Sequence, residues 1–364
     1  MWFPEMARLG NDSLVLLLLS LAWVVTRKAF DPRGKTFHFA LLGVVCGLGL
    51  LTKATMLPFV AALGLFLTWC TWRARGDAGA VRASASRLVV FCLVTVAIAA
   101  WWYANNLIVY GNILGSNDAI ALARQGGLLK GLSENFSLPR SILGMVGNIE
   151  SFLWAATWSF VHPWRVMEIP LIILLVVVAV GWIWHAARAK AISSLDAIAA
   201  LTLVLFIIAL LQHTLVFIAL LGAFSPGAWY LHSLAPVLAP WVARGLAEAA
   251  AWRRARPLVS ALVIYPVLFL PFATALELFY FAGCFDEPSD VAHFGLTVVA
   301  TCAAFPREVL RHLTVLGNPA LALPLFGTGW VAMLIGFALV IRQRFFTPER
   351  RVLFPVDCCP AVNA

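Results

Sequence analysis

One lysine lies in the middle of a long apolar run, where a charged side chain needs a physical reason. Lys53 belongs to the stretch GLGLLTKATMLP, inside apolar residues that extend from Phe37 to Trp72. An ammonium group suits a phosphate partner, because it donates charge-assisted hydrogen bonds to the phosphate oxygens. A charge at the centre of a bilayer costs about 2.5 to 3.5 kcal/mol. Lys53 is therefore either a buried functional cation or the place where the run turns, and at a turn it could bind a phosphate or simply reach lipid headgroups.

Three other side chains could bind a polar ligand. His232 lies next to Tyr230 in the stretch WYLHSLAP, and its imidazole is either an acid or base or an ordinary aromatic residue of the membrane interface. Glu277 falls in the last two turns of an apolar segment, where it is either exposed at the interface or paired with Lys53 or Arg307. We predict Lys53, Tyr230, His232 and Glu277 as binding residues.

The acidic residues suggest two further roles. Asp12 opens an apolar segment, where it is either a helix N-cap or a supporting acidic group. Asp286, Glu287 and Asp290 form a cluster whose oxygens could hold a divalent cation, although a solvated acidic loop is the simpler interpretation. A divalent cation is thus the one cofactor that the sequence suggests.

The composition indicates what positions these residues. Of 364 residues, 62% are apolar and 12% are charged, whereas soluble domains carry about 25% charged residues. Apolar stretches long enough to cross a hydrocarbon core of about 30 Å recur along the chain, which predicts an all-α polytopic membrane protein. The formal charge of +9 is scattered in short basic clusters beside the apolar runs, so we expect no nucleic-acid partner.

The apolar runs predict nine membrane spans and two long segments between them. The spans cover about 12–27, 37–53, 55–72, 88–109, 169–187, 197–221, 229–248, 258–281 and 320–342. The chain then divides into four spans in 1–109, an interfacial segment in 110–168, four spans in 169–281, an outer loop in 282–319, and a last span with a cytoplasmic tail in 320–364.

Most of the 26 basic residues fall in alternate loops, which predicts the orientation. Because cytoplasmic loops carry the excess of Lys and Arg, the N-terminus is expected outside and the C-terminus inside, as in a bacterial inner membrane. The run 37–72 has basic clusters on both flanks and would form a helix of about 54 Å if continuous. It must therefore be a hairpin, with a turn at Leu51–Thr55 that places Lys53 at the outer rim.

The stretch WWYANNLIVYGNILGSND carries a resemblance to a known family. It is similar to a motif of the polyprenyl-phosphate-sugar-dependent glycosyltransferases of the GT-C superfamily, of the aminoarabinose- and mannosyltransferase type. Its pattern is W-x-x-R-N, three apolar residues, then Y-G-D-P-L-G. The matching positions are Trp102, Asn106, Tyr110, Gly111, Leu114 and Gly115.

Four more stretches resemble this family in the same order. They are GNDSL at residues 10–14, the glycine-rich LLGVVCGLGLLTK at 41–53, SFLWAATW at 151–158 and WYLHSLAP at 229–236. The resemblance implies a GT-C-like helical fold and transfer of a sugar from a polyprenyl-phosphate donor at the outer face. It adds Asn106 and Tyr110 to the expected substrate-binding residues, and it implies membrane lipid as a further partner.

The sequence also departs from the family pattern. Asn105 replaces an Arg, Asn112 replaces an Asp, and Ala228 or Trp229 stands where a second Arg is expected. The family's catalytic carboxylate lies in a first outer loop that would precede Met1, so the chain resembles the C-terminal two-thirds of such an enzyme. No catalytic residue is assigned, apart from Asp12 as a supporting acid. A degenerate or non-catalytic subunit that acts with a partner is the main alternative, and a lipid or solute transporter is a weaker one.

Overall fold

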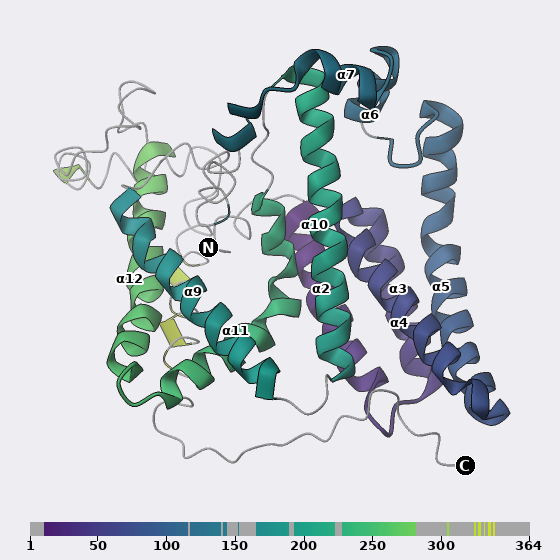
Figure 1. The fold of residues 1–364 in the computed structure, drawn as a ribbon, viewed down its shortest axis with the longest axis horizontal. Helices are drawn as coiled ribbons and strands as arrows, with labels where there is room; N and C mark the ends of the chain where they lie inside the picture. Colours follow the sequence, from purple (N-terminus) through teal and green to yellow (C-terminus); the bar gives the residue numbers. More distant parts are fainter. Residues whose placement is uncertain are drawn as a thin grey trace. The chain divides into compact units, whose positions relative to one another are not determined.

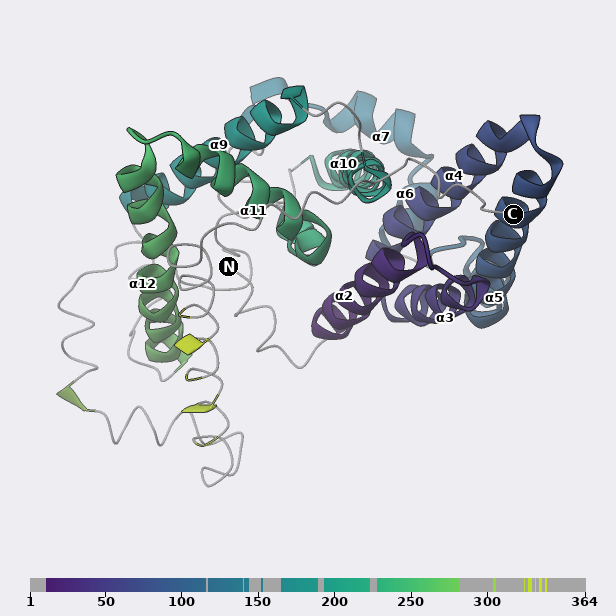
Figure 2. The same cartoon turned by 90° about the horizontal axis from the view of Figure 1, so that it is seen from below.

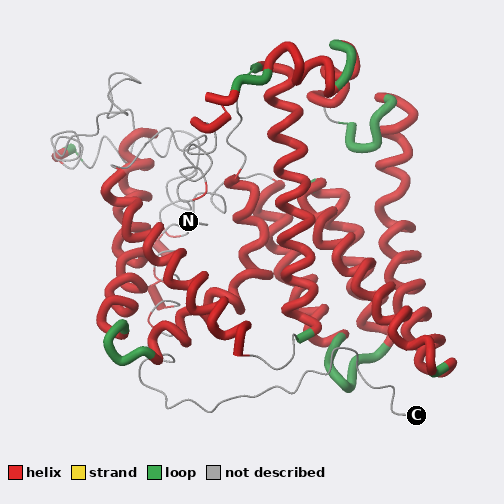
Figure 3. Tube along the Cα trace, in the orientation of Figure 1, coloured by secondary structure: helices red, strands yellow, loops and turns green. Residues whose placement is uncertain are grey.

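The computed structural model describes residues 11–115, 117–139, 141–143, 152, 165–188, 193–222 and 228–281, with isolated residues between 304 and 338. Helices account for the secondary structure throughout these ranges, and no strand occurs in them (Figure 3). The predicted all-α class is confirmed for this part of the chain. Four of its helical segments are long and apolar enough to cross a membrane, namely Ala54–Gly76, Ala78–Tyr110, Val166–Arg188 and Ser194–Leu221.

The chain divides into two compact units. The first contains Met1–Ala155, Val177–Ala251 and Val356–Ala364, and the second contains Ala156–Val176 and Trp252–Pro355. Helix α9 (Arg165–Arg188) contributes its first half to the second unit and its second half to the first. The candidate residues that the structure describes with their side chains belong to the first unit.

Five helices form the centre of the first unit. They are α2 (Asn11–Ala29), α3 (Thr36–Thr52), α4 (Leu57–Arg73), α5 (Ala78–Tyr110) and α10 (Ser194–Leu221). Helix α3 packs between α2 and α5, while α4 contacts both α5 and α10 (Figures 1 and 2). Their shared core includes the fully buried side chains Phe39, Leu42, Phe59, Leu63 and Phe91.

Glycines bring α3 and α5 into close contact. A Cβ atom at Gly43 would lie 2.9 Å from the carbonyl oxygen of Phe91, and one at Gly47 would lie 2.8 Å from Cβ of Ile98. Helices in lipid are held together by such tight packing, because lipid tails are as apolar as the side chains and no hydrophobic force drives association. The glycine-rich stretch that resembles the GT-C motif therefore forms a helix-packing face.

The predicted hairpin around Lys53 is confirmed. Helix α3 ends at Thr52, Lys53 adopts an extended conformation, and the short helix η1 (Ala54–Met56) leads into α4. The amide of Met56 donates to the carbonyl of Lys53 at 3.2 Å and closes the turn. Pro58 lies in the first turn of α4, where its missing N–H costs no helical hydrogen bond.

Helix α5 begins ten residues before the apolar span predicted at 88–109. Asp77 is its N-cap and accepts hydrogen bonds from the amides of Gly79 at 2.8 Å and Ala80 at 3.2 Å. At its other end Gly111 adopts a left-handed conformation with φ of 65°. The hydropathy pattern thus marks the apolar part of a helix that continues well beyond it.

Two short amphipathic helices follow, α6 (Asn117–Arg124) and α7 (Leu128–Asn135), and both contact α10. The side-chain amide of Asn135 donates to the carbonyl of Ala219 at 2.8 Å, in the last turn of α10 where carbonyls lack helical partners. Gly131 packs against the same residue, since an added Cβ would lie 2.7 Å from that carbonyl oxygen. The two short helices, separated by a turn at residues 125–127, therefore lie across the end of α10.

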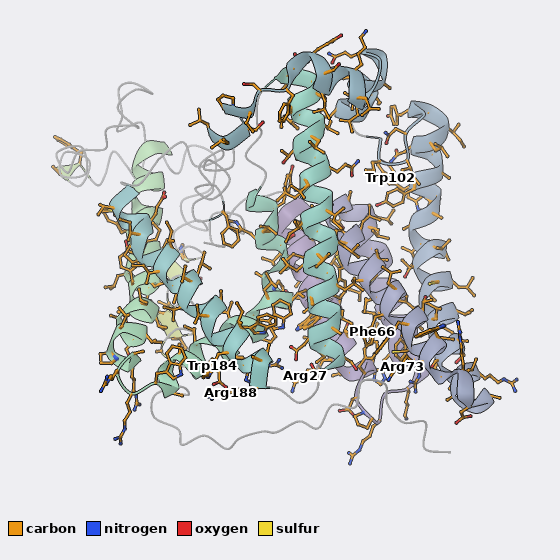
Figure 4. All side chains as sticks on the ribbon, viewed as in Figure 1. Arg27, Phe66, Arg73, Trp102, Trp184 and Arg188 are labelled. Atoms are coloured by element: carbon orange, nitrogen blue, oxygen red, sulfur yellow. The ribbon has the colours of Figure 1, made fainter. Side chains whose placement is uncertain are left out.

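Basic residues gather at one end of the first unit. Figure 4 shows Arg27, Arg73 and Arg188 at the end opposite to Trp102. Arg188 stacks on Trp184 with its guanidinium carbon 4.3 Å from the ring centre, a cation–π contact. Two further contacts of this kind join Arg73 to Trp69 at 5.5 Å and Arg75 to Trp72 at 4.8 Å. Arginines of three predicted inner loops thus lie at a common end.

The first unit is completed by η3 (Ala228–Leu234) and α11 (Ala235–Ala251), both of which contact α2. In the second unit, α12 (Arg256–Phe281) packs against the start of α9. There the hydroxyl of Tyr265 donates to the carbonyl of Met167 at 2.6 Å, and Leu171 is buried with Val259 and Leu262.

Candidate functional site

The described structure brings together two of the predicted binding residues. The ammonium nitrogen of Lys53 lies 5.0 Å from the ring centre of Tyr230, within the range of a cation–π interaction. The same ring meets the imidazole of His213 edge to face, with centres 5.7 Å apart and planes at 84°. His213 in turn contacts Phe217 with ring centres 4.8 Å apart. We call Lys53, Tyr230 and His213 the Lys53 cluster.

The Lys53 cluster does not reach the ends of the long helices α5 and α10. The hydroxyl of Tyr103 on α5 donates to the carbonyl of Leu50 at 3.1 Å, which fixes the level of the α3 end. Helix α5 continues to Tyr110, about 10 Å further at 1.5 Å per residue, and α10 continues about 12 Å beyond His213. In Figure 1 both helices rise above the α3–α4 hairpin. The turn that carries Lys53 therefore lies about two helical turns short of the ends of α5 and α10, and its place at an outer rim stays a prediction.

His232 contacts Phe152, which belongs to the stretch SFLWAATW. Its Nε2 atom lies 2.7 Å from the carbonyl oxygen of Phe152, and the two rings are 5.7 Å apart between centres. The side chain of His232 is buried, and its Nδ1 atom has no hydrogen-bond partner. Helix η3 lies outside the four helices that could cross a membrane, and burial lowers the pKa of His232 to about 4 there. At neutral pH the imidazole is therefore uncharged.

The conformation of η3 is held locally. The hydroxyl of Ser233 donates to the carbonyl of Tyr230 at 2.7 Å, which ties the two ends of the turn that carries both ring side chains. Leu234, the last residue of η3, is fully buried in the core of the first unit. Tyr230 and His232 are thus fixed relative to the bundle although they precede α11.

Asn106 and Tyr110 do not share one environment. Asn106 is 2% exposed and packs beneath Gly115, where an added Cβ would lie 2.9 Å from its Cγ atom. Tyr110 ends α5 and is 52% exposed. Gly111 and Gly115 both have positive φ, of 65° and 60°, so the motif that resembles Y-G-D-P-L-G builds a tight turn at the end of α5.

The remaining candidates lie wholly or partly outside the described residues. Asp12 is in the first turn of α2, and its side chain is outside the description, as is that of Glu277 in α12. The acidic cluster Asp286, Glu287 and Asp290 also lies outside it. Among the residues that are described, no group of three His, Cys, Asp or Glu side chains could hold a metal ion.

A second polar cluster lies where α9, α10 and α11 meet. The carboxylate of Asp196 accepts hydrogen bonds from Arg244, from Ser193 Oγ at 2.6 Å and from Trp241 Nε1 at 3.0 Å. Nearby, His185 Nδ1 lies 3.0 Å from a carboxylate oxygen of Glu248. No motif joins these residues in the sequence, although Asp196 and Arg244 both flank predicted inner loops.

This second cluster is a structural junction. Helices α9 and α11 cross in direct backbone contact, since a Cβ on Gly181 would lie 2.1 Å from the carbonyl oxygen of Gly245. The rings of Trp182 and Trp241 lie 4.4 Å apart between centres beside that crossing. Paired charges and tight packing of this kind hold three helices together.

Comparison with known proteins adds no relative: no family model, no curated protein and no solved structure matches this chain.

Proposed function

We propose that this protein is a membrane glycosyltransferase of the GT-C type, or a part of one, that moves a sugar from a polyprenyl-phosphate donor to an acceptor. One observation carries the proposal. Three stretches that resemble motifs of that family meet in the first unit: the L-T-K end of α3 supplies Lys53, the stretch WYLHSLAP supplies Tyr230 and His232, and the stretch SFLWAATW supplies Phe152.

The roles of the residues follow from their chemistry. The Lys53 ammonium binds the phosphate of the donor and neutralises the negative charge that develops on it as the glycosyl bond breaks. The Tyr230 ring positions the ammonium group. His232, uncharged at neutral pH, offers hydrogen bonds but no positive charge that would attract the phosphate away from Lys53. The same proposal includes nine membrane spans, an outer location of this site and a bacterial inner membrane.

The orientation is supported by the distribution of arginines. Arg27, Arg73 and Arg188 lie at the end of the first unit opposite to Trp102, which follows the predicted excess of basic residues in cytoplasmic loops. With that end inside, α6 and α7 lie at the outer interface, where short amphipathic helices are stable.

A direct test is sugar transfer in proteoliposomes. The full protein in proteoliposomes is supplied with a polyprenyl-phosphate-linked hexose and an acceptor lipid. We expect turnover that falls at least tenfold in Lys53→Ala and is largely kept in Lys28→Ala, a matched lysine at the end of α2. Absence of turnover in the unaltered protein would refute the enzyme proposal.

A non-catalytic subunit is the second candidate, and the replacement of an acidic residue of the family pattern favours it. Asn112, which replaces the Asp of the family pattern, uses its side-chain oxygen to accept the amide of Leu114 at 2.8 Å. It acts there as a turn-forming residue. Binding of polyprenyl phosphate without transfer, together with recovery of a second protein on purification, would favour the subunit.

A further inference from the structure

Two buried polar atoms without hydrogen-bond partners belong to the two turns that carry Lys53 and Tyr230. Within the described residues, Thr55 Oγ1 and His232 Nδ1 are the buried side-chain atoms that make no hydrogen bond. Thr55 follows Lys53 by two residues, and His232 follows Tyr230 by two residues. A buried polar atom without a partner destabilises the folded state, so binding of a ligand or a water that pairs with it is favoured.

The hydrogen bond at Nε2 of His232 determines which kind of partner its Nδ1 atom needs. The carbonyl of Phe152 can only accept, so Nε2 of His232 must carry the ring proton. In the neutral ring Nδ1 is then unprotonated and can only accept. An anionic phosphate oxygen cannot satisfy it, whereas a hydroxyl group can.

The two sides of the site therefore differ in chemistry. Lys53 offers a positive charge beside the Tyr230 ring, and His232 offers a neutral acceptor on the same short helix as that ring. Thr55 offers a hydroxyl on the turn that carries the lysine. A ligand that satisfies all three carries a phosphate and, close to it, hydroxyl groups.

We infer that His232 Nδ1 accepts a hydrogen bond from a hydroxyl of the sugar in the bound donor, with Thr55 Oγ1 as a second sugar contact. This inference rests on the proposed function and adds to it the group that distinguishes a sugar-linked lipid from the bare lipid phosphate. His232 is thus a specificity residue for the sugar, whereas Lys53 binds the phosphate that both lipids share.

Two substitutions separate the nitrogens of His232. In His232→Gln the terminal amide occupies the position of Nε2 and still donates to Phe152, but the acceptor at Nδ1 is lost. In His232→Asn an amide oxygen replaces Nδ1 as acceptor, but the bond to Phe152 is lost. The probes are a short-chain polyprenyl phosphate and the same lipid with a phosphate-linked hexose, titrated into the full protein in detergent micelles.

The unaltered protein is expected to bind the hexose-linked lipid more tightly than the bare phosphate. His232→Gln should reduce this preference about 3- to 10-fold, the effect of one hydrogen bond, with little change in melting temperature. His232→Asn should keep the preference and lower the melting temperature. Thr55→Val should weaken binding of the hexose-linked lipid while the melting temperature stays the same or rises, because an unpartnered hydroxyl is removed.

The outcomes separate this inference from the proposed function. A protein that binds both lipids equally, or a His232→Gln variant that keeps the full preference, would refute the sugar contact while lipid-phosphate binding stands. A protein that binds neither lipid would overturn both. Loss of binding to both lipids in Lys53→Ala, with normal melting, would support the division of labour between the two residues.

Discussion

The ammonium nitrogen of Lys53 lies 5.0 Å from the ring centre of Tyr230, although α3 and η3 are far apart in the sequence. The contact joins the turn of a helical hairpin to the segment that precedes α11. It also gives a charged residue inside an apolar run a specific neighbour, because the face of an aromatic ring attracts a cation even where water is scarce.

The first prediction concerns the ring of Tyr230. Tyr230→Leu removes the aromatic face and should weaken binding of a polyprenyl phosphate about 2- to 30-fold, the range expected for loss of 0.5 to 2 kcal/mol of cation–π energy. Tyr230→Phe keeps the ring and should bind nearly as tightly as the unaltered protein. Titration in detergent measures both, and an equal loss in the two variants would show that the hydroxyl, not the ring, matters.

The second prediction concerns the contact of α3 with α5. Gly47→Ala places a methyl group where only 2.8 Å separates it from Cβ of Ile98, and should destabilise the fold by about 1 to 3 kcal/mol. Gly64→Ala on α4 is the control, because nothing lies within 4 Å of its added Cβ. That change should stabilise the helix by about 0.5 to 1 kcal/mol. Melting in detergent distinguishes them, and similar melting of both variants would contradict the packing role.

The third prediction is a pH dependence. Because the pKa of His232 falls from 6.5 in the unfolded chain to about 4 in the folded protein, the unfolded state binds the proton more readily. The stability contribution is complete above pH 6.5 and is lost as the pH falls toward 4, by at most about 3 kcal/mol. His232→Gln should remove this part of the acid sensitivity. Parallel melting curves of the two proteins between pH 7 and pH 4 would contradict it.

The fourth prediction concerns the junction of α10 and α11. Asp196→Asn weakens the hydrogen bonds from Arg244 and Trp241 and should destabilise the first unit by about 1.5 to 3 kcal/mol. A double-mutant cycle with Arg244→Gln should show that the two changes are not additive. Glu134→Gln, an exposed position on α7, is the control and should have little effect. Additive losses would mean that the pair does not act as a unit.

Much of the fold was predictable because hydrophobic length is a strong signal. The run 37–72 is too long for one crossing, and the structure turns within the predicted Leu51–Thr55 segment. The true start of α5 was missed, since Asp77 caps a polar extension that a hydropathy pattern does not reveal. Helix η3 was missed as well, because a window that recognises apolar residues does not separate a short 3-10 helix from the α-helix that follows it.

The candidate site was predictable residue by residue but not as an arrangement. Lys53, Tyr230 and His232 stand out by type and position, whereas the contact of Tyr230 with His213 depends on how α10 packs beside η3. His213 lies within an apolar helix and carries no motif, so nothing in the sequence marks it. Asn106, expected to bind substrate, is almost completely buried under Gly115, a packing that its motif does not reveal.

The unequal helix lengths have a consequence for the surrounding lipid. Helices α3 and α4 have 17 residues each, about 25 Å, while the neighbouring α5 has 33, about 50 Å. A bilayer with a hydrocarbon core of about 30 Å meets a short hairpin by becoming thinner beside it. Such a local depression would draw headgroups toward Lys53, so the lipid-linked donor of the proposed function would reach the lysine without being lifted out of its leaflet.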